Sequence, residues 1–226
     1  AMKKQLNTIY KNAQNLLSLV NQLLDFRKLE MKGERLHLMN GDMEEFIVSA
    51  YNNFMPMAVE KHLNFVNQSE HRALYMFFDR DKVHKIVNNL LSNAFKYTPQ
   101  GKQIKTVITE TETEVAVTVE DQGIGIAEDK QKSLFVRFEN LMDKNLFNQS
   151  STGIGLSLVK ELVEMHHGHI SLHSHPGEGS RFTIRLPKGK SHFDETTEFI
   201  LSDQVITDTG QVFQTSQLPL LAESGQ

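Results

Sequence analysis

Residues 79–97, DRDKVHKIVNNLLSNAFKY, restrict the possible folds more than any other stretch of the chain. On a helical wheel of roughly 100° per residue, apolar side chains cover one half of this stretch. They are Val83, Ile86, Val87, Leu90, Leu91, Ala94 and Phe95. Asp79 or Asp81 is suited to begin the helix, because a carboxylate caps free N–H groups. A helix with so wide an apolar side is expected to pack on a second layer of structure.

The opposite side of this helix is polar in an unusual way. Asn89, Asn93, Lys96 and Tyr97 fall within an arc of about 100°. Asparagine is a poor helix former, so a pair of them one turn apart needs an explanation. A solvated surface explains them, and so does a binding site. The helix alone leaves both interpretations open.

The rest of residues 42–188 alternates helix and strand patterns. Helices are predicted from Asp42 through DMEEFIVSAYNNFMPMAVEK, near 128–137, and over 153–168 with Gly168 as C-cap. Period-two alternation predicts strands, with 63–68 pairing with 73–78, 104–110 with 114–121, and a last hairpin over 169–187. This order predicts an α/β (α+β) two-layer sandwich, in which helices cover one face of a mixed, mostly antiparallel sheet.

The two ends of the chain differ from this middle part. Residues 3 to about 31 predict one long helix, whose apolar seam suits a helix bundle better than a two-stranded coil. The seam is Leu6, Ile9, Ala13, Leu16, Val20 and Leu23, widened by Leu17 and Leu24. Docking of this helix on the rest of the chain is the alternative. Residues 191–226 contain six acidic residues and no Lys or Arg, which indicates a linker in which QVITDTGQVF could form a short hairpin.

Composition excludes several classes of protein. The absence of cysteine excludes disulfides and thiolate zinc sites. A net charge of −4 argues against a general nucleic-acid surface, which needs a basic excess. No apolar run reaches the roughly 18 residues that a membrane span requires.

Three glycine-containing stretches suggest close backbone approach to a ligand. DQGIGI (121–126) follows a predicted strand, and STGIGL (151–156) enters a predicted helix whose N-terminus favours phosphate. PGEGSRF (176–182) lies in the last hairpin. Each is a weak motif alone, since most such stretches are simple turns.

Together and in this order, these pieces resemble the catalytic ATP-binding domain of sensor histidine kinases. This domain belongs to the GHKL superfamily, with a Bergerat ATP-binding fold, which also includes gyrase. The resemblance covers residues 79–186, with an N box at NNLLSNAFKYTP, an F box at LFVRFEN and the glycine boxes DQGIGI, STGIGL and GEGSRF. YKNAQNLLSLVNQLLDFRKLE resembles the second helix of the dimerisation and phosphotransfer domain. The sequence of these stretches is most similar to that of hybrid two-component regulators of Bacteroides-type bacteria.

The resemblance implies ATP and Mg²⁺ as cofactors. Asn93, and with it Asn89, would hold Mg²⁺ on the phosphates, for which a neutral amide oxygen is a suitable hard ligand. Asp121 would accept a hydrogen bond from the adenine amino group, and Tyr97 would wall the pocket. Asn93, Lys96 and Arg137 would be catalytic, with Lys96 meeting phosphate and Arg137 stabilising the γ-phosphate.

The remaining nucleotide-binding residues implied by the resemblance come from the glycine boxes and the F box. They are Gly123, Gly125, Ile126, Phe138, Thr152, Gly153, Ile154, Gly155, Leu156 and Ser180. Residues 139–152 would be the ATP lid, in which Ser151 replaces a more usual glycine. The lid is long and polar, as a mobile cover should be.

The implied protein is larger than this chain. Residues 3–34 would lack the phosphoacceptor histidine, whose H-E-x-x-T/N segment is absent here and lies on the first bundle helix in the family. Residues 35–190 would be the catalytic domain, and 191–226 a linker toward a receiver domain. The expected partners are a second copy through the N-terminal helix, the phosphotransfer helix and the receiver. No nucleic acid is expected on this segment. The expected location is the cytoplasmic part of an inner-membrane sensor kinase, anchored through a separate sensor part.

Alternatives remain within and outside this class. An ATPase of the superfamily would carry a glutamate where Asn89 stands, to activate water. A serine kinase of the anti-sigma-factor type, or a nucleotide-free pseudokinase scaffold, are the others. A metal site in MHHGHISLHSH is also conceivable, although the hairpin is expected to spread its five histidines over different faces: His166, His167, His169, His173 and His175.

Overall fold

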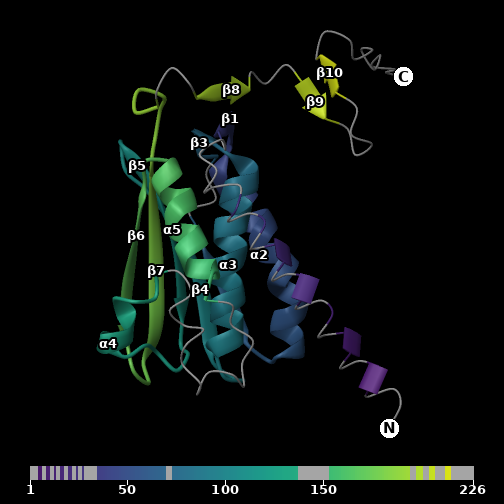
Figure 1. The fold of residues 1–226 in the computed structure, drawn as a ribbon, viewed down its shortest axis with the longest axis vertical. Helices are drawn as coiled ribbons and strands as arrows, with labels where there is room; N and C mark the ends of the chain where they lie inside the picture. The colour runs from purple at the N-terminus through teal and green to yellow at the C-terminus, as the bar shows by residue number, and fades with distance from the viewer. Residues whose placement is uncertain are drawn as a thin grey trace, which may run out of the picture.

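The computed structural model describes most of the chain between residues 35 and 193. The described residues are 35–69, 73–136, 153–193, 197–200, 204–206 and 212–214, and single residues or pairs between 5 and 27. Figure 1 shows two layers in this part, a sheet on one side and helices on the other. The two-layer sandwich predicted from the sequence is therefore confirmed.

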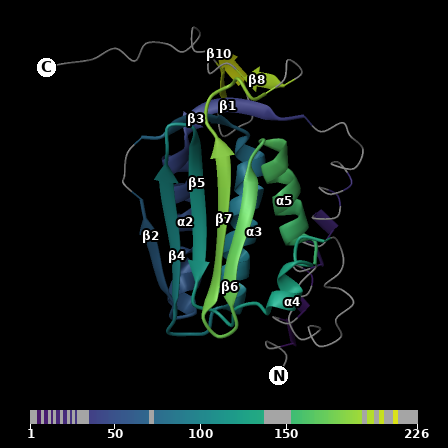
Figure 2. The ribbon, with the colours of Figure 1, turned by 90° about the vertical axis from the view of Figure 1, so that its left-hand side faces the viewer.

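The main sheet has five strands in the order β2–β4–β5–β7–β6. Their bounds are β2 Asn64–Gln68, β4 Gln103–Glu110, β5 Glu114–Asp121, β6 His169–His175 and β7 Gly179–Pro187. β2 pairs with β4 in parallel, and the other pairs are antiparallel, as predicted for a mixed, mostly antiparallel sheet. Figure 2 shows this order face-on, with α4 (Glu128–Gln131) beside β6.

Three helices cover one face of this sheet: α2 (Met43–Glu60), α3 (Arg80–Tyr97) and α5 (Gly155–Met165). All seven apolar side chains predicted to form the buried half of α3 are buried in the core. Asp79 is the N-cap of α3, and its carboxylate accepts a hydrogen bond from the Lys82 N–H. Asp42 caps α2 in the same way, so both predicted helix starts are correct.

The predicted pairing of 63–68 with 73–78 is wrong. β2 lies next to β4, whereas β3 (Tyr75–Phe78) pairs with β1 (His37–Asp42) in a separate small sheet. β1 was not predicted at all, because HLMNGD is poor in the β-branched and aromatic residues that favour strands. β8 (Glu198–Ile200) completes the small sheet by pairing in parallel with β1, and β9 (Gln204–Ile206) and β10 (Val212–Gln214) form the hairpin expected near the C-terminus.

Two helix ends also differ from prediction. α4 is a single turn, and the chain continues to Val136 in i+3 turns rather than as a helix. At the end of α5, His167 and not Gly168 adopts the left-handed conformation, with φ 56°. Gly168 serves close packing instead, since a Cβ there would lie 2.2 Å from the Arg185 carbonyl oxygen.

The described residues between 5 and 27 have helical backbone and exposed side chains. Leu6, Ile9, Leu16 and Leu17 are each about 60% exposed, so this apolar stripe has no cover within the described part of the chain. No helix formed by the described residues combines the length and apolarity needed to cross a membrane.

Candidate functional site

The C-terminal half of α3 presents its polar side to α5. The Asn89 side-chain N–H donates to the Lys85 carbonyl oxygen (2.8 Å). Its Oδ1 faces the first residue of α5, because a Cβ on Gly155 would lie 2.6 Å from that oxygen. Asn89 and Asn93 are half-buried, one turn apart on the same side. Gly155 thus allows the start of α5 to lie against the Asn89 amide.

The end of α3 meets the loop that follows β5. Lys96 and Tyr97 are half-buried, and the Lys96 ammonium lies 5.1 Å from the centre of the Tyr97 ring. A Cβ on Gly123 would lie 2.7 Å from the Tyr97 carbonyl oxygen. The polar residues of the helix and the first glycine stretch, predicted from separate motifs, therefore adjoin.

Asp121 is the buried acid of this region, only 7% exposed. Burial raises the pKa of its carboxyl group to about 6, although the N–H groups of Gly123 and Ser180 stabilise the charged form and so act in the opposite direction. Oδ1 accepts the Gly123 N–H at 2.8 Å. No cation stands among the described groups that set this pKa. Asp121 is therefore an under-compensated carboxylate, able to accept a hydrogen bond from a ligand.

The first and third glycine stretches are in direct contact. Gly125 has φ 67°, and a Cβ there would lie 1.9 Å from the His175 carbonyl oxygen. Gly179 has φ 96°, and its Cβ would lie 1.9 Å from the Asp121 carbonyl oxygen. The Gly177 N–H donates to the Ile124 carbonyl oxygen at 2.8 Å. These approaches require glycine, so the turn of 176–178 is more than a plain hairpin turn.

The second glycine stretch forms the start of α5. Gly153 has φ 64°, and Ile154 is the N-cap, without a side-chain cap for the first N–H groups. Ile154 is buried and Leu156 is half-buried. No side chain among the described residues caps this helix start, a position whose N–H groups favour an anion. Arg137, Phe138, Thr152 and the predicted lid, 139–152, lie outside the described residues.

Two residues that hold the glycine loop were not predicted. Gln131 donates to the Ile126 carbonyl oxygen, and Ser174 accepts the Ile126 N–H. Ser174 could have been noticed in the alternating pattern of β6. It occupies the next inward-facing position after Ile170 and Leu172 but has a polar side chain. Gln131 had none.

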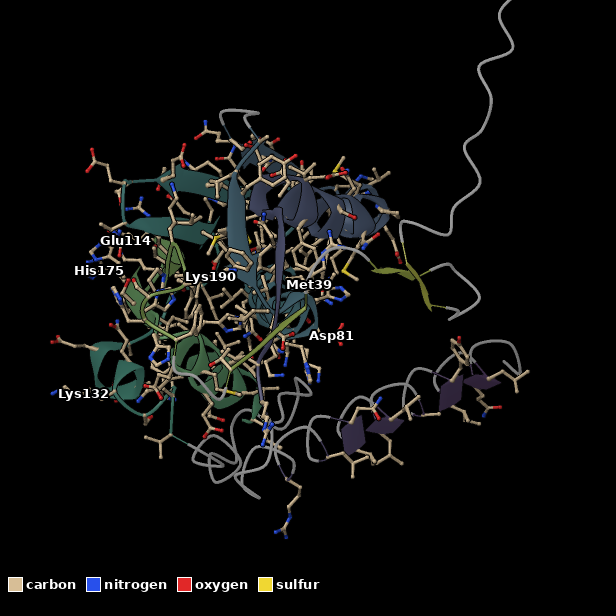
Figure 3. All side chains as sticks on the ribbon, turned by 90° about the horizontal axis from the view of Figure 1, so that it is seen from above. Met39, Asp81, Glu114, Lys132, His175 and Lys190 are labelled. Carbon is tan, nitrogen blue, oxygen red and sulfur yellow. The ribbon has the colours of Figure 1, made fainter. Side chains whose placement is uncertain are left out.

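The five-histidine stretch does not bring three metal ligands together within the described residues. Among the described residues, no group of three or more His, Asp or Glu side chains could hold a metal ion. The expected reason was partly wrong, since His169, His173 and His175 share the outer, exposed face of β6. Figure 3 shows His175 on the side of the sheet away from the helices. His166 is buried, and burial lowers its pKa.

The assembled groups suit one kind of ligand. A carboxylate lies at one end, next to glycine backbone, and amide oxygens and a helix start lie at the other. This set fits a molecule with an amino group on a flat ring and anionic oxygens that carry a hard cation.

Comparison with known proteins supports the same class. Residues 78–190 match the family described as histidine kinase-, DNA gyrase B-, and HSP90-like ATPase. Histidine kinase P4 of Formosa agariphila is 34% identical over 97% of this chain and 16% of its own length. Hybrid signal transduction histidine kinase D of Dictyostelium discoideum is 30% identical over 93% of this chain and 14% of its own length. The chain therefore spans less than a fifth of either relative.

A solved structure supports the fold. Full-length ShkA in complex with AMPPNP superposes with a TM-score of 0.71 at 24% identity, covering 84% of this chain and 39% of that one. The resemblance drawn from the motifs is confirmed. The chain belongs to the family of histidine kinase-, DNA gyrase B- and HSP90-like ATPases, in the form found in sensor and hybrid histidine kinases.

Proposed function

We propose that residues 35–190 are the catalytic ATP-binding domain of a hybrid sensor kinase that phosphorylates a histidine on a helix outside this chain. Bound ATP supplies the phosphoryl group. The observation that carries the proposal is the convergence of Asp121, the glycine backbone at 123–125 and the Asn89–Gly155 contact. These groups come from three separate segments and match the two ends of a nucleotide.

Asp121 is proposed to select the base. Its carboxylate is buried and already accepts the Gly123 N–H, which fixes the direction of its remaining lone pairs. If the carboxylate faces position 6 of the purine, it accepts a hydrogen bond from the amino group of adenine but not from the carbonyl group of guanine, so adenine is favoured. Tyr97 and Ile126, which flank this loop, are proposed to border the base.

Asn89 and Asn93 are proposed as Mg²⁺ ligands, and Lys96 as the phosphate cation. The Asn89 Nδ2 is bonded to the Lys85 carbonyl oxygen, which turns Oδ1 toward the start of α5. The first N–H groups of α5, at Gly155 and Leu156, would lie near anionic oxygens on that side. Arg137, Phe138 and Thr152 keep the roles that the F box and lid imply.

Phosphotransfer fits better than ATP hydrolysis. The residue one turn before Asn93 is Asn89, whose amide cannot remove a proton from water. A histidine acceptor supplies its own nucleophile, so the domain needs to position it rather than to activate it. A serine kinase and a nucleotide-free scaffold are the remaining alternatives, and failure to bind nucleotide would favour the scaffold.

Residues 3–34 are proposed as the second helix of a dimeric phosphotransfer bundle. The apolar stripe of Leu6, Ile9, Leu16 and Leu17 is exposed and therefore requires a partner. Leu16→Glu should reduce the mass measured by sedimentation from dimer to monomer. An unchanged mass would mean that this stripe is not the interface. Residues 191–226 are proposed to lead to a receiver domain, and the whole protein to be anchored in the inner membrane.

The test of the nucleotide site is calorimetric titration with ADP and a non-hydrolysable ATP analogue, with and without Mg²⁺. The chain should bind both, with the ATP analogue gaining affinity from Mg²⁺, and Asp121→Asn should abolish binding. Glu114→Gln is the matched control, because Glu114 lies at the opposite end of β5 and pairs with Arg185. No binding to the parent chain at millimolar nucleotide would overturn the proposal.

A further inference from the structure

The loop between β5 and α4 is held at its far end by two side chains outside the glycine boxes. The Gln131 side-chain Nε2 donates to the Ile126 carbonyl oxygen at 2.8 Å and to the Ser174 carbonyl oxygen at 2.9 Å. One amide group thus joins α4, the loop and β6. Both of its protons are used, so only a side chain that donates twice can replace it.

Ser174 holds the same loop residue through its backbone N–H. Its Oγ accepts the Ile126 N–H at 2.9 Å and donates to the Gly179 carbonyl oxygen at 2.7 Å. Ser180 Oγ lies 3.0 Å from Ser174 Oγ. A hydroxyl has one proton, and that of Ser174 goes to Gly179, so Ser180 is the donor in this contact. Because its proton is used in this contact, Ser180 Oγ can only accept further hydrogen bonds.

These bonds fix both backbone polar groups of Ile126. Its N–H goes to Ser174 and its carbonyl oxygen to Gln131. The near end of the loop is fixed separately, where Gly123 binds Asp121. Ser174 is only 5% exposed, so water does not readily replace its hydroxyl. The path from Asp121 to Ile126 is consequently anchored at each end.

We infer that Gln131 and Ser174 are positioning residues that set the affinity and base preference of the nucleotide site through Ile126. The inference rests on the proposed function, because it assigns the loop of 122–127 to the base. Neither residue needs to touch the ligand. Releasing Ile126 lets the loop depart from the position in which Asp121 and the glycine backbone meet a flat ring together.

The variants distinguish the effect of losing these hydrogen bonds from the effect of changing the size of the side chain. Gln131→Glu keeps the shape but cannot donate to two carbonyl oxygens, and Ser174→Ala removes the hydroxyl alone. Gln131→Met tests loss of the bonds without a new charge. Lys132→Gln is the matched control, because Lys132 is exposed and lies at the outer side of α4 (Figure 3).

Each variant is measured in the 226-residue chain by ADP and GDP titration, by thermal unfolding, and by amide hydrogen exchange without ligand. Gln131→Glu, Gln131→Met and Ser174→Ala should weaken ADP binding about tenfold, as expected for one or two lost hydrogen bonds. The ratio of ADP to GDP affinity should fall by a similar factor. Exchange should rise in residues 122–127 but not in α3 or β5. Lys132→Gln should match the parent.

ADP affinities within twofold of the parent would overturn the inference. So would a loss of affinity accompanied by faster exchange throughout the sheet, since the bonds would then only stabilise the fold. If the parent itself binds no ADP, the proposed function fails. Unchanged exchange at 122–127 in all three variants would overturn the anchoring of the loop independently of any ligand.

Discussion

Asp79 and Asp121 are both buried, at 3% and 7% exposure, yet their surroundings differ in kind. Burial opposes the charge of each. At Asp79, the N–H groups of His37 and Lys82 and the Lys82 ammonium outweigh burial and hold the pKa of the carboxyl group below its usual value. At Asp121, burial prevails and raises the pKa to about 6. The charge of Asp79 is therefore compensated by groups of the chain, and the charge of Asp121 is not.

The compensated acid joins elements at the N-terminal end of α3. Its Oδ2 lies 3.0 Å from the Lys82 ammonium, which also donates to the Arg35 carbonyl oxygen at 3.1 Å. The Asp79 N–H donates to His166 Nε2 at 3.2 Å, and His166 Nδ1 is 2.7 Å from the Leu162 carbonyl oxygen. His166 must therefore be neutral, with its proton on Nδ1. A buried carboxylate whose charge is under-compensated is a candidate for a ligand-binding group.

The largest expected effect is at the compensated acid. Asp79→Ala leaves the buried Lys82 ammonium without its carboxylate, which should lower the free energy of unfolding by about 3–5 kcal/mol. Asp79→Asn keeps a helix cap and should cost roughly half as much. Urea denaturation monitored by circular dichroism measures both. A loss below 1 kcal/mol for Asp79→Ala would show that the ion pair does not stabilise this end of the domain.

Neutralising the under-compensated acid should have the opposite effect on stability. Asp121→Asn removes a charge that burial disfavours, while its side-chain oxygen can still accept the Gly123 N–H. At pH 8 the free energy of unfolding should rise, by about 1 kcal/mol. ADP binding should be abolished, because the hydrogen bond to the charged acceptor that selects the base is lost. Lower stability at pH 8 would contradict the view that Asp121 is kept for binding at the expense of stability.

The pH dependence of the two acids should also have opposite signs. The folded chain holds a proton on Asp121 between its unfolded value of 3.8 and about 6, so the associated stabilisation is present below pH 4 and lost as pH rises through 6. Asp79, with a lowered pKa, stabilises the fold above 3.8 and loses this effect as pH falls. Comparing the pH–stability profiles of the parent, Asp121→Asn and Asp79→Asn separates the two contributions.

ADP binding should follow the same ionisation. With a pKa of about 6, roughly one Asp121 carboxyl group in ten is charged at pH 5, so the ADP affinity should be about tenfold lower than at pH 8. Titration of the parent chain at both pH values measures this ratio. A constant affinity would mean that Asp121 does not accept a hydrogen bond from the ligand in its charged form.

Regions with regular local patterns could be predicted from the sequence. The apolar period of 79–97 gave the buried half of α3, and strict alternation gave β5 with its observed bounds, Glu114–Asp121. Asn89, Asp121 and the glycines followed from short motifs, whose backbone requirements are local. β1 could not be predicted, because its strand character comes from pairing with β3 and β8 rather than from its own residues.

The compensating partners could not be predicted for the same reason. Lysine is rarely buried, and Lys82 is buried where it meets the Asp79 carboxylate and the Arg35 carbonyl oxygen. Ser174 binds Ile126 across 48 residues of sequence. Such bonds depend on which surfaces the fold brings together, so the sequence indicated the proposed ligand-binding residues better than the residues that hold them.

The smallest expected effect tests whether burial, rather than helical spacing, makes the Asp79–Lys82 pair strong. Lys160 and Glu164 are also separated by one helical turn, on α5. The Lys160 Nζ lies 3.8 Å from the Glu164 Oε1, but both side chains are about half exposed. Water screens this pair, and its contribution should be below about 0.5 kcal/mol. Glu164→Gln should therefore leave the urea midpoint and the ADP affinity close to those of the parent, and added salt should change the midpoint of the parent little. A loss comparable with that of Asp79→Asn would mean that ion pairs stabilise these helices regardless of burial, and the contrast between the two acids would then need another cause.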